Sequence, residues 1–403
     1  MKKRETWMKF RHRVAWAVLY PILAPITLLK FPIKVTKYRE QKKRPMLILF
    51  NHQTPFDQFF VGMAFKGPIY FIATEDILSN GWISRVIQWL LAPIPIKKQA
   101  GDFSAVMTAL RVAREGATIA MAPEGNRTYS GKTEYINPAV APLAKKMKLP
   151  IALYRIEGGY GMEPRWSNVT RAGKMRGYVH QVIEPETYAS LSNEELYQMI
   201  CDGLYVNEGK SDGVFRSAKR AEYLERAIYV CPFCGLAEFE SHGNEAECKR
   251  CHRKIIYGVD KSITGIGYEF PFRFMTEWYD YQNRYVNGLD LLVFNREPAF
   301  RDQARISEVI IKKQKQVLRD NAVVSLYGDR IVIDESSNDA LVIPFDEVTA
   351  AACLGRNKLN IYHGSMVYQF KGSKRFNALK YVNFYYRYKN IKRGDLSGEF
   401  LGL

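Results

Sequence analysis

His52 and Asp57 lie five residues apart in the stretch Asn-His-Gln-Thr-Pro-Phe-Asp, residues 51–57. A histidine ring can take a proton from a hydroxyl near neutral pH, and a carboxylate bonded to one ring nitrogen leaves the other free to do so. The same residues also fit a plain helix start, with Thr54 as N-cap, Pro55 in the first turn and Asp57 favoured by the helix dipole. The pair alone therefore predicts either a general base with its orienting carboxylate or a capped helix.

The predicted elements around the pair favour a catalytic role, because they place both side chains on a turn. The apolar run 46–50 predicts a buried strand, and 56–65 predicts the start of a helix, so both side chains lie between them. Loops in this position carry side chains that a rigid scaffold holds in place.

A second polar loop, Pro-Glu-Gly-Asn-Arg at residues 123–127, follows the apolar run 117–122. Gly125 allows close backbone approach, Arg127 offers a planar fork for phosphate or carboxylate, and Glu124 adds a carboxylate. A turn closed by an internal Glu–Arg pair is the alternative interpretation.

Strands alternate with helices over residues 45–206, which predicts an α/β layer with its functional loops gathered at one edge of the sheet. The predicted strands are 46–50, 68–73, 93–96, 117–122, 150–156 and 177–183. The predicted helices are 82–91, 103–113, 138–147 and 196–205, the last opened by a capping box at Ser192.

These blocks together resemble the glycerolipid acyltransferase family, typified by 1-acyl-glycerol-3-phosphate acyltransferase. The family's N-H-x-x-x-x-D block falls on residues 51–57, and its P-E-G-T-R block falls on 123–127 with Asn126 in place of Thr. A short apolar strand ending in a cation falls on 95–98, and a Pro-containing strand falls on 149–151. Two such blocks in the right order, each after a predicted strand, are far more specific than either alone.

The resemblance implies direct acyl transfer from a thioester, acyl-CoA or acyl-carrier protein, to a hydroxyl of a lysophospholipid. It makes His52 the base and Asp57 its orienter. The residues that it assigns to a pocket for the acceptor phosphate are Lys98, Glu124, Gly125 and Arg127. Lys98 stands where the family has Arg, and Thr74 stands where it often has Lys, so phosphate recognition is expected to be looser.

The amino-terminal segment, residues 1–44, holds thirteen Lys or Arg and only two acids, Glu5 and Glu40. Within it, residues 14–29 carry no charge but contain Pro21 and Pro25, which suits an interfacial helical segment better than a span. Trp7, Trp16 and Tyr20 would then lie at headgroup depth. We therefore expect a peripheral or monotopic protein on the anionic cytoplasmic face of a membrane; a buried helix pair and a signal peptide or true span are the alternatives.

The chain has 403 residues, 47% of them hydrophobic, which excludes a mainly disordered protein and predicts two or three domains. Its six cysteines include two C-x-x-C pairs separated by thirteen residues. This spacing resembles a zinc ribbon over residues 229–257, with a structural zinc ion held by Cys231, Cys234, Cys248 and Cys251. Redox-active pairs are the alternative.

The composition of residues 207–214 predicts a linker, and a helix is predicted to follow at 218–228. In the carboxy-terminal part, 258–403, a basic helix is predicted at 301–319, short strands within 322–370 and a closing helix at 376–388. This α+β arrangement, an antiparallel barrel-like core with a closing helix, resembles a PH or GRAM domain. Its cations either meet anionic lipid or form a solvated face: Lys371, Lys374, Arg375, Lys380, Arg387, Lys389, Lys392 and Arg393.

Two other functions compete with a membrane-associated acyltransferase. One is a lipid-binding scaffold with an inactive acyltransferase fold. The other is a zinc-ribbon protein that binds nucleic acid or has a regulatory function. No nucleic acid is expected, because the four Lys and Arg of the ribbon are matched by four Glu. The sequence names no protein partner for the ribbon.

Overall fold

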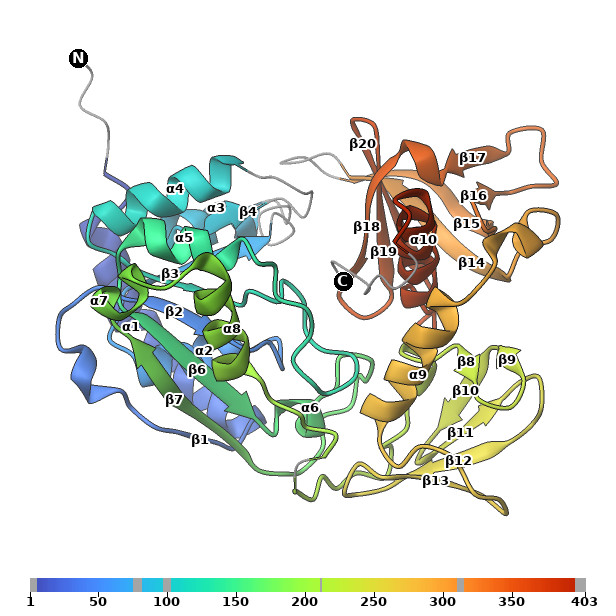
Figure 1. The fold of residues 1–403 in the computed structure, drawn as a ribbon, viewed down its shortest axis with the longest axis horizontal. Helices are drawn as coiled ribbons and strands as arrows, with labels where there is room; N and C mark the ends of the chain where they lie inside the picture. The colour runs from blue at the N-terminus through green and yellow to red at the C-terminus, as the bar shows by residue number, and fades with distance from the viewer. Residues whose placement is uncertain (1–5, 75–81, 97–102, 211, 310–314, 396–403) are drawn as a thin grey trace. The chain divides into compact units, whose positions relative to one another are not determined.

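The computed structural model describes residues 6–74, 82–96, 103–210, 212–309 and 315–395 (Figure 1). The chain forms two compact units. Unit 1 comprises Met1–Pro164 and Ala172–Gly213, and unit 2 comprises Arg165–Arg171 and Val214–Leu403.

Unit 1 is built on a seven-stranded sheet in the order β1-β7-β6-β2-β5-β3-β4. β6, β2, β5, β3 and β4 run parallel, whereas β7 is antiparallel to β6. The strands are β1 (Ile33–Val35), β2 (Leu47–Phe50), β3 (Ile69–Thr74), β4 (Ile94–Ile96), β5 (Thr118–Met121), β6 (Ile151–Glu157) and β7 (Met175–Ile183). The predicted α/β layer is confirmed, and β1 is the one strand of this sheet that the sequence did not predict.

Helices cover both faces of this sheet (Figure 1). On one face, side chains of α4, α5 and α8 form a core with Leu47 and Leu49 of β2. On the other face, α2 packs on Tyr154 of β6, with α1 against α2 and α3. The helices are α1 (Phe10–Lys30), α2 (Asp57–Ala64), α3 (Trp82–Leu91), α4 (Phe103–Arg114), α5 (Val140–Met147), α6 (Gly159–Met162), α7 (Pro185–Ala189) and α8 (Asn193–Leu204).

α1 is one continuous helix that contains both Pro21 and Pro25. Trp7, Trp16 and Tyr20, which we expected at headgroup depth, are partly buried against other residues of unit 1. Trp16 stacks on Tyr20, and the two rings leave no room for a Cβ at Gly67 and Gly62. Trp7 donates its indole N–H to the carbonyl of Ala92, so all three aromatics pack inward.

Unit 2 begins with turns rather than with the helix predicted at 218–228, of which only a short 3-10 turn, Leu224–Arg226, is present. Tyr223 has a left-handed φ of 74°, and its N–H donates to the Ser241 hydroxyl. The Leu224 N–H is shared between the same hydroxyl and the Ala221 carbonyl. A hairpin and a four-stranded antiparallel sheet follow. Their strands are β8 (Val230–Cys231), β9 (Gly235–Leu236), β10 (Phe239–His242), β11 (Glu245–Cys248), β12 (Lys254–Tyr257) and β13 (Ile263–Gly265).

The rest of unit 2 is a seven-stranded antiparallel sheet in the order β17-β16-β15-β14-β20-β19-β18. Its strands are β14 (Phe300–Glu308), β15 (Gln316–Leu326), β16 (Arg330–Ile333), β17 (Leu341–Pro344), β18 (Val348–Leu354), β19 (Lys358–His363) and β20 (Met366–Gly372). α9 (Met275–Asn287) precedes this sheet, and the predicted closing helix is present as α10 (Leu379–Lys392).

The basic helix predicted at 301–319 is wrong, because the described part of this stretch belongs to β14 and β15. Ala304 and Ile306 of β14 are buried and pair with both β15 and β20, while Arg305 points outward to an ion pair with Asp320 on the neighbouring strand. Pairing on both edges of a buried strand outweighs the helix propensity of its charged residues.

Residues Arg165–Arg171, which lie between α6 and β7 in the sequence, belong to the core of unit 2. Trp166 is fully buried and packs edge-on against Tyr257, and the Arg171 guanidinium lies over both rings. The Arg226 guanidinium donates to the Trp166 carbonyl at 2.8 Å. The chain therefore passes between the two units three times.

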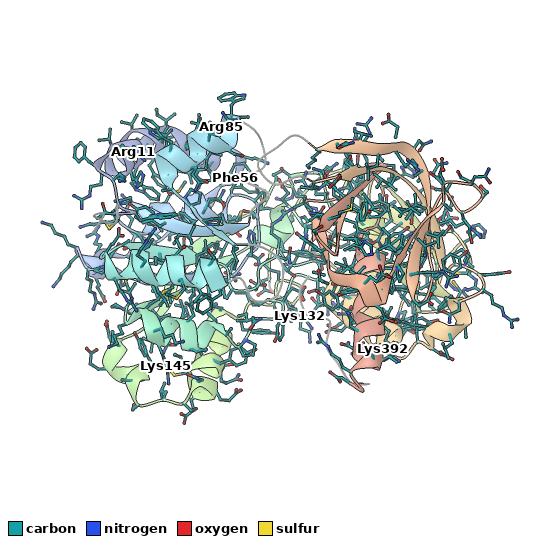
Figure 2. All side chains as sticks on the ribbon, turned by 90° about the horizontal axis from the view of Figure 1, so that it is seen from above. Arg11, Phe56, Arg85, Lys132, Lys145 and Lys392 are labelled. Atoms are coloured by element: carbon teal, nitrogen blue, oxygen red, sulfur yellow. The ribbon has the colours of Figure 1, made fainter. Side chains whose placement is uncertain are left out.

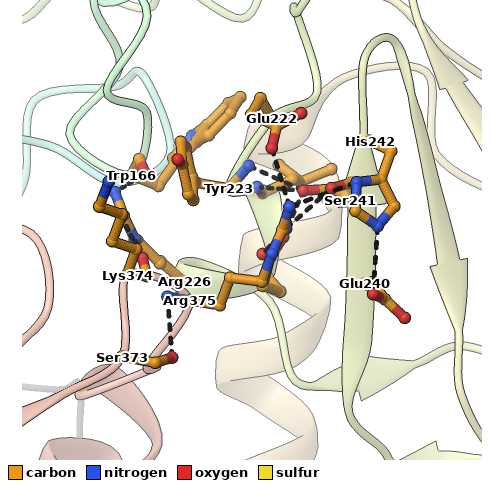
Figure 3. A network of polar contacts seen from close by, with 12 residues as sticks. Trp166, Glu222, Tyr223, Arg226, Glu240, Ser241, His242, Ser373, Lys374 and Arg375 are labelled. Atoms are coloured by element: carbon orange, nitrogen blue, oxygen red, sulfur yellow. Dashed lines mark hydrogen bonds and ion pairs between the residues drawn. The ribbon is translucent and has the colours of Figure 1, made fainter.

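Several cations predicted to form a lipid-binding or solvated face of unit 2 are internal instead. Arg375 pairs with Glu222 and Glu225 in the network of Figure 3. Lys380 is buried and pairs with Asp302 at 2.8 Å, and Arg387 is buried and donates to the Leu289 carbonyl. Lys380 and Arg387 are buried and need these partners, whereas Arg375 is partly exposed and is held by two carboxylates. All three therefore stabilise the unit through internal contacts.

Candidate active site

His52 and Asp57 meet at the carboxyl end of β2, as the sequence predicts. Nδ1 of His52 lies 2.8 Å from Oδ2 of Asp57. The imidazole is 26% exposed, whereas the Asp57 side chain is completely buried. This contact fixes the proton on Nδ1, so Nε2 is the ring nitrogen that can accept a proton from a substrate hydroxyl.

The Asp57 carboxylate is held by three further donors at the start of α2. The N–H of Gln53 donates to it at 2.7 Å, and the N–H and hydroxyl of Thr54 donate at 2.9 Å and 2.7 Å. Asp57 is also the first residue of α2, where the helix dipole favours a negative charge. α2 begins at Asp57 with Phe56 at the N-cap, so the expected N-cap role of Thr54 and first-turn position of Pro55 are wrong, and only the dipole position of Asp57 is as expected. The donors to the Asp57 carboxylate hold it against His52.

The loop after β5 holds the backbone of His52. β2 and β5 are adjacent parallel strands, so the residues that follow them lie at one edge of the sheet. The His52 N–H donates to Oε1 of Glu124 at 2.7 Å, and the His52 carbonyl accepts from the Thr128 N–H at 3.2 Å. Both backbone polar groups of His52 are thus bonded to the loop that carries Arg127.

Glu124 points into the fold. Oε1 accepts from His52, and Oε2 accepts from the N–H of Glu134 at 2.8 Å. Burial raises the pKa of the Glu124 carboxyl well above its usual range, and these two N–H donors offset that effect in part. The sequence assigned Glu124 to a substrate pocket, and the structure places its carboxylate between two backbone segments.

Asn51 and Gln53, which flank His52, anchor the loop after β2 to β6 and α6. The Asn51 amide donates to the Ile156 carbonyl at 2.8 Å and accepts from the Ile156 N–H at 2.7 Å. The Gln53 amide oxygen accepts from the Tyr160 N–H at 2.8 Å. These roles could not be predicted from the sequence, because their partners are backbone groups about one hundred residues away.

The other residues predicted for the phosphate pocket are Gly125, Arg127 and Lys98. Gly125 is exposed at φ 70°, and a Cβ there would meet nothing within 4 Å. Arg127 is partly exposed two residues further along the same loop. Lys98 lies outside the described residues. β4, the strand that precedes it, ends at Ile96 and runs parallel to β3.

The four predicted metal-binding cysteines of unit 2 form one cluster. All four sulfur atoms lie within 4.8 Å of one another, with 3.7 Å between Cys231 and Cys251 and 3.6 Å between Cys234 and Cys248. A tetrahedral zinc ion with Zn–S bonds of about 2.3 Å requires sulfur atoms about 3.8 Å apart, whereas a disulfide requires about 2.0 Å. The cluster therefore fits a metal ion with four thiolate ligands.

Comparison with known proteins finds similarity over the part of unit 1 that carries the candidate site. A family model described as Acyltransferase matches residues 32–155, which include β1 to β5, most of β6 and both loops of the site. A search of curated proteins finds no match. One similar solved structure is the 1-acyl-sn-glycerophosphate (LPA) acyltransferase PlsC from Thermotoga maritima, with 21% identity and a TM-score of 0.40, covering 49% of this chain and 80% of that one. Residues 32–155 are therefore similar to the family described as Acyltransferase.

Proposed function

We propose that this protein is a membrane-associated O-acyltransferase. It moves a fatty acyl chain from a thioester, acyl-CoA or acyl-carrier protein, to a hydroxyl of a lysophospholipid such as 1-acyl-glycerol-3-phosphate. The observation that carries the proposal is the bond between His52 Nδ1 and the buried Asp57 carboxylate within the matched family domain.

His52 acts as the general base. Nε2 takes the proton of the acceptor hydroxyl as the hydroxyl oxygen bonds to the thioester carbonyl carbon. The tetrahedral intermediate then breaks its C–S bond, and the departing thiolate takes the proton from the imidazolium. Asp57 stabilises the imidazolium without being protonated itself. The products are an ester and a free thiol, and His52 returns to its starting state.

The acceptor phosphate is bound by the loop after β5. Arg127 supplies a guanidinium there, and Gly125 leaves its backbone open to a ligand. Lys98 is proposed to add a second cation. Glu124 shapes this pocket by holding the loop rather than by touching the ligand, since both of its oxygens already accept N–H groups.

The direct test combines purified protein with a radiolabelled acyl thioester and a panel of acceptors: lysophospholipids, monoacylglycerol and glycolipids. We expect labelled diacyl product from at least one lysophospholipid. Vesicle binding without any product would instead favour the lipid-binding scaffold. A steeply salt-dependent affinity for DNA or RNA would favour the nucleic-acid function.

The proposed membrane surface is an apolar face on α1 and α3. Five exposed apolar residues of α1 follow one another at intervals of four and form one stripe: Phe10, Val14, Val18, Ile22 and Ile26. On α3, which packs beside α1, Trp82, Ile83, Val86 and Trp89 are exposed. Figure 2 labels Arg11 and Arg85, two exposed cations of these helices that would meet anionic headgroups.

α1 could in principle also span a membrane. Among the described residues it is the one helix with sufficient length and apolar composition, and 17% of its most apolar window is buried. We propose that it lies on the cytoplasmic face instead, because its buried residues and its contacts with α2 and α3 bind it to unit 1 along one side.

The double substitution Val18→Asp/Ile22→Asp should weaken binding to vesicles that contain anionic lipid by at least about tenfold, since each apolar side chain stabilises binding by about 1.5–3 kcal/mol when fully buried. Vesicle co-sedimentation measures this effect. The matched control is Val317→Asp/Val342→Asp, which adds the same two charges at equally exposed valines of unit 2. Equal binding by both variants would contradict the proposed membrane face.

In unit 2 we propose that the four cysteines hold a zinc ion. Such a closed four-thiolate site has no open position for substrate, so the ion would stabilise the fold and take no part in acyl transfer. We propose no nucleic-acid partner for the ribbon, and two of its four cations pair with glutamates, Lys249 with Glu240 and Lys254 with Glu247.

A further inference from the structure

Glu134 lies outside both family motifs, yet its carboxylate closes the loop that carries Arg127. Oε1 of Glu134 accepts from the hydroxyls of Thr128 and Ser130 at 3.0 Å and 2.9 Å. The same two hydroxyls accept from the N–H groups of Gly131 and Lys132, which makes residues 128–134 a compact turn. One acid therefore organises the segment that directly follows Arg127.

This turn is bonded to the catalytic histidine on both sides. The Thr128 N–H donates to the His52 carbonyl. The Glu134 N–H donates to Glu124, and Glu124 accepts from the His52 N–H. A closed ring of hydrogen bonds thus runs from His52 through Glu124, Glu134 and Thr128 back to His52. Arg127 lies in the segment between Glu124 and Thr128, both ends of which this ring holds.

The electrostatics show that this arrangement carries a cost. Burial raises the pKa of the Glu134 carboxyl, and the Ser130 and Thr128 hydroxyls offset that effect in part. The neighbouring Glu124 is buried, and the Glu134 carboxylate contributes to raising the pKa of the Glu124 carboxyl. A buried Glu124 beside a partly exposed Glu134 is costly unless both carboxylates are hydrogen-bonded, and here each of them accepts two donors.

We propose that Glu134 is a positioning residue that sets the distance between His52 and Arg127, and hence between the reacting hydroxyl and the phosphate of the acceptor. The inference rests on the proposed function, in which Arg127 binds that phosphate. Glu134 itself touches neither substrate nor the imidazole; it acts through Thr128, Ser130 and Glu124.

The experiment compares kcat/KM for 1-acyl-glycerol-3-phosphate with kcat/KM for monoacylglycerol, which has a hydroxyl but no phosphate. Glu134→Ala should lower the first value about tenfold more than the second, because small displacements of a substrate-holding group cost this much or more. Glu134→Gln keeps an oxygen that can accept from both hydroxyls and should restore most of the ratio. Ser130→Ala, which removes one donor, should lower the ratio less than Glu134→Ala.

The controls separate the possible failures. Glu186→Ala removes an exposed acid of α7 and should leave the ratio unchanged. An equal loss for both acceptors in Glu134→Ala, without rescue by Glu134→Gln, would show a merely structural role and overturn the inference. Absence of transfer to either acceptor by the unaltered protein would instead remove the proposed function, and with it this role of Glu134.

Discussion

His52→Ala should lower turnover with an acyl thioester and a lysophospholipid by about 10³-fold or more. Without the imidazole the acceptor hydroxyl loses its base, and a positioned base contributes about 10²–10⁴-fold. Asp57→Asn should lower turnover by about 10²–10⁴-fold, because the amide N–H₂ cannot accept the Nδ1 proton and the ring would turn its proton toward the substrate. Initial rates with a thiol-detecting reagent measure both effects.

Folding must be separated from chemistry in these variants. Asp57 accepts two backbone N–H groups and the Thr54 hydroxyl, so Asp57→Ala would leave buried donors unpaired and destabilise unit 1 by about 1–3 kcal/mol each. Asp57→Asn keeps one oxygen for the Thr54 N–H and hydroxyl and loses only the bond from the Gln53 N–H, so it is the better probe. Its melting temperature should stay within a few degrees of that of the unaltered protein while its rate falls.

Matched controls sharpen the result. His180→Ala and Asp202→Ala remove an exposed histidine of β7 and an exposed acid of α8 from the same unit, and both should retain full turnover. If His52→Ala and His180→Ala showed the same rate, His52 would not be the base, and the assignment of this site as an acyltransferase centre would fail.

Much of unit 1 could be predicted from its sequence, because its signals are local. The predicted helix 82–91 coincides with α3, and the Ser192 hydroxyl and the Glu195 carboxylate form the predicted capping box of α8. Apolar runs of strand length bounded by Pro and Gly gave β2, β3, β5 and β6 to within two residues. These elements place His52 and the 123–127 loop at one sheet edge, so the candidate site could be predicted with them.

Long-range contacts explain what the sequence could not show. The direction of the Glu124 carboxylate depends on N–H groups at positions 52 and 134, and the strand character of 301–308 depends on pairing with β15 and β20. Trp166 provides the clearest case. No periodicity or motif indicates that a residue between α6 and β7 belongs to the core of the other unit, since its environment is supplied by Tyr257 and Arg226.

Cys248→Ser should remove the metal ion and unfold the region around it. The apparent free energy of structural zinc binding, about 10–16 kcal/mol in small zinc-binding peptides, is of the order of a whole domain's stability. Trp278 reports on this region. It is fully buried between Phe239 and Phe270, and its indole N–H donates to the Val230 carbonyl at 2.9 Å, one residue before Cys231. Its fluorescence should shift to longer wavelength as the ring meets water.

Elemental analysis by mass spectrometry should find about one zinc ion per chain in the unaltered protein and almost none in Cys248→Ser. Cys201→Ser, which alters a cysteine of α8 in unit 1, is the control and should keep both the zinc ion and the tryptophan spectrum. Redox pairs predict a different outcome: no zinc, and four fewer free thiols when the protein is unfolded without reductant. The sulfur separations of 3.6 Å and 3.7 Å favour the metal, because they match the edge of a zinc tetrahedron and are nearly twice a disulfide bond.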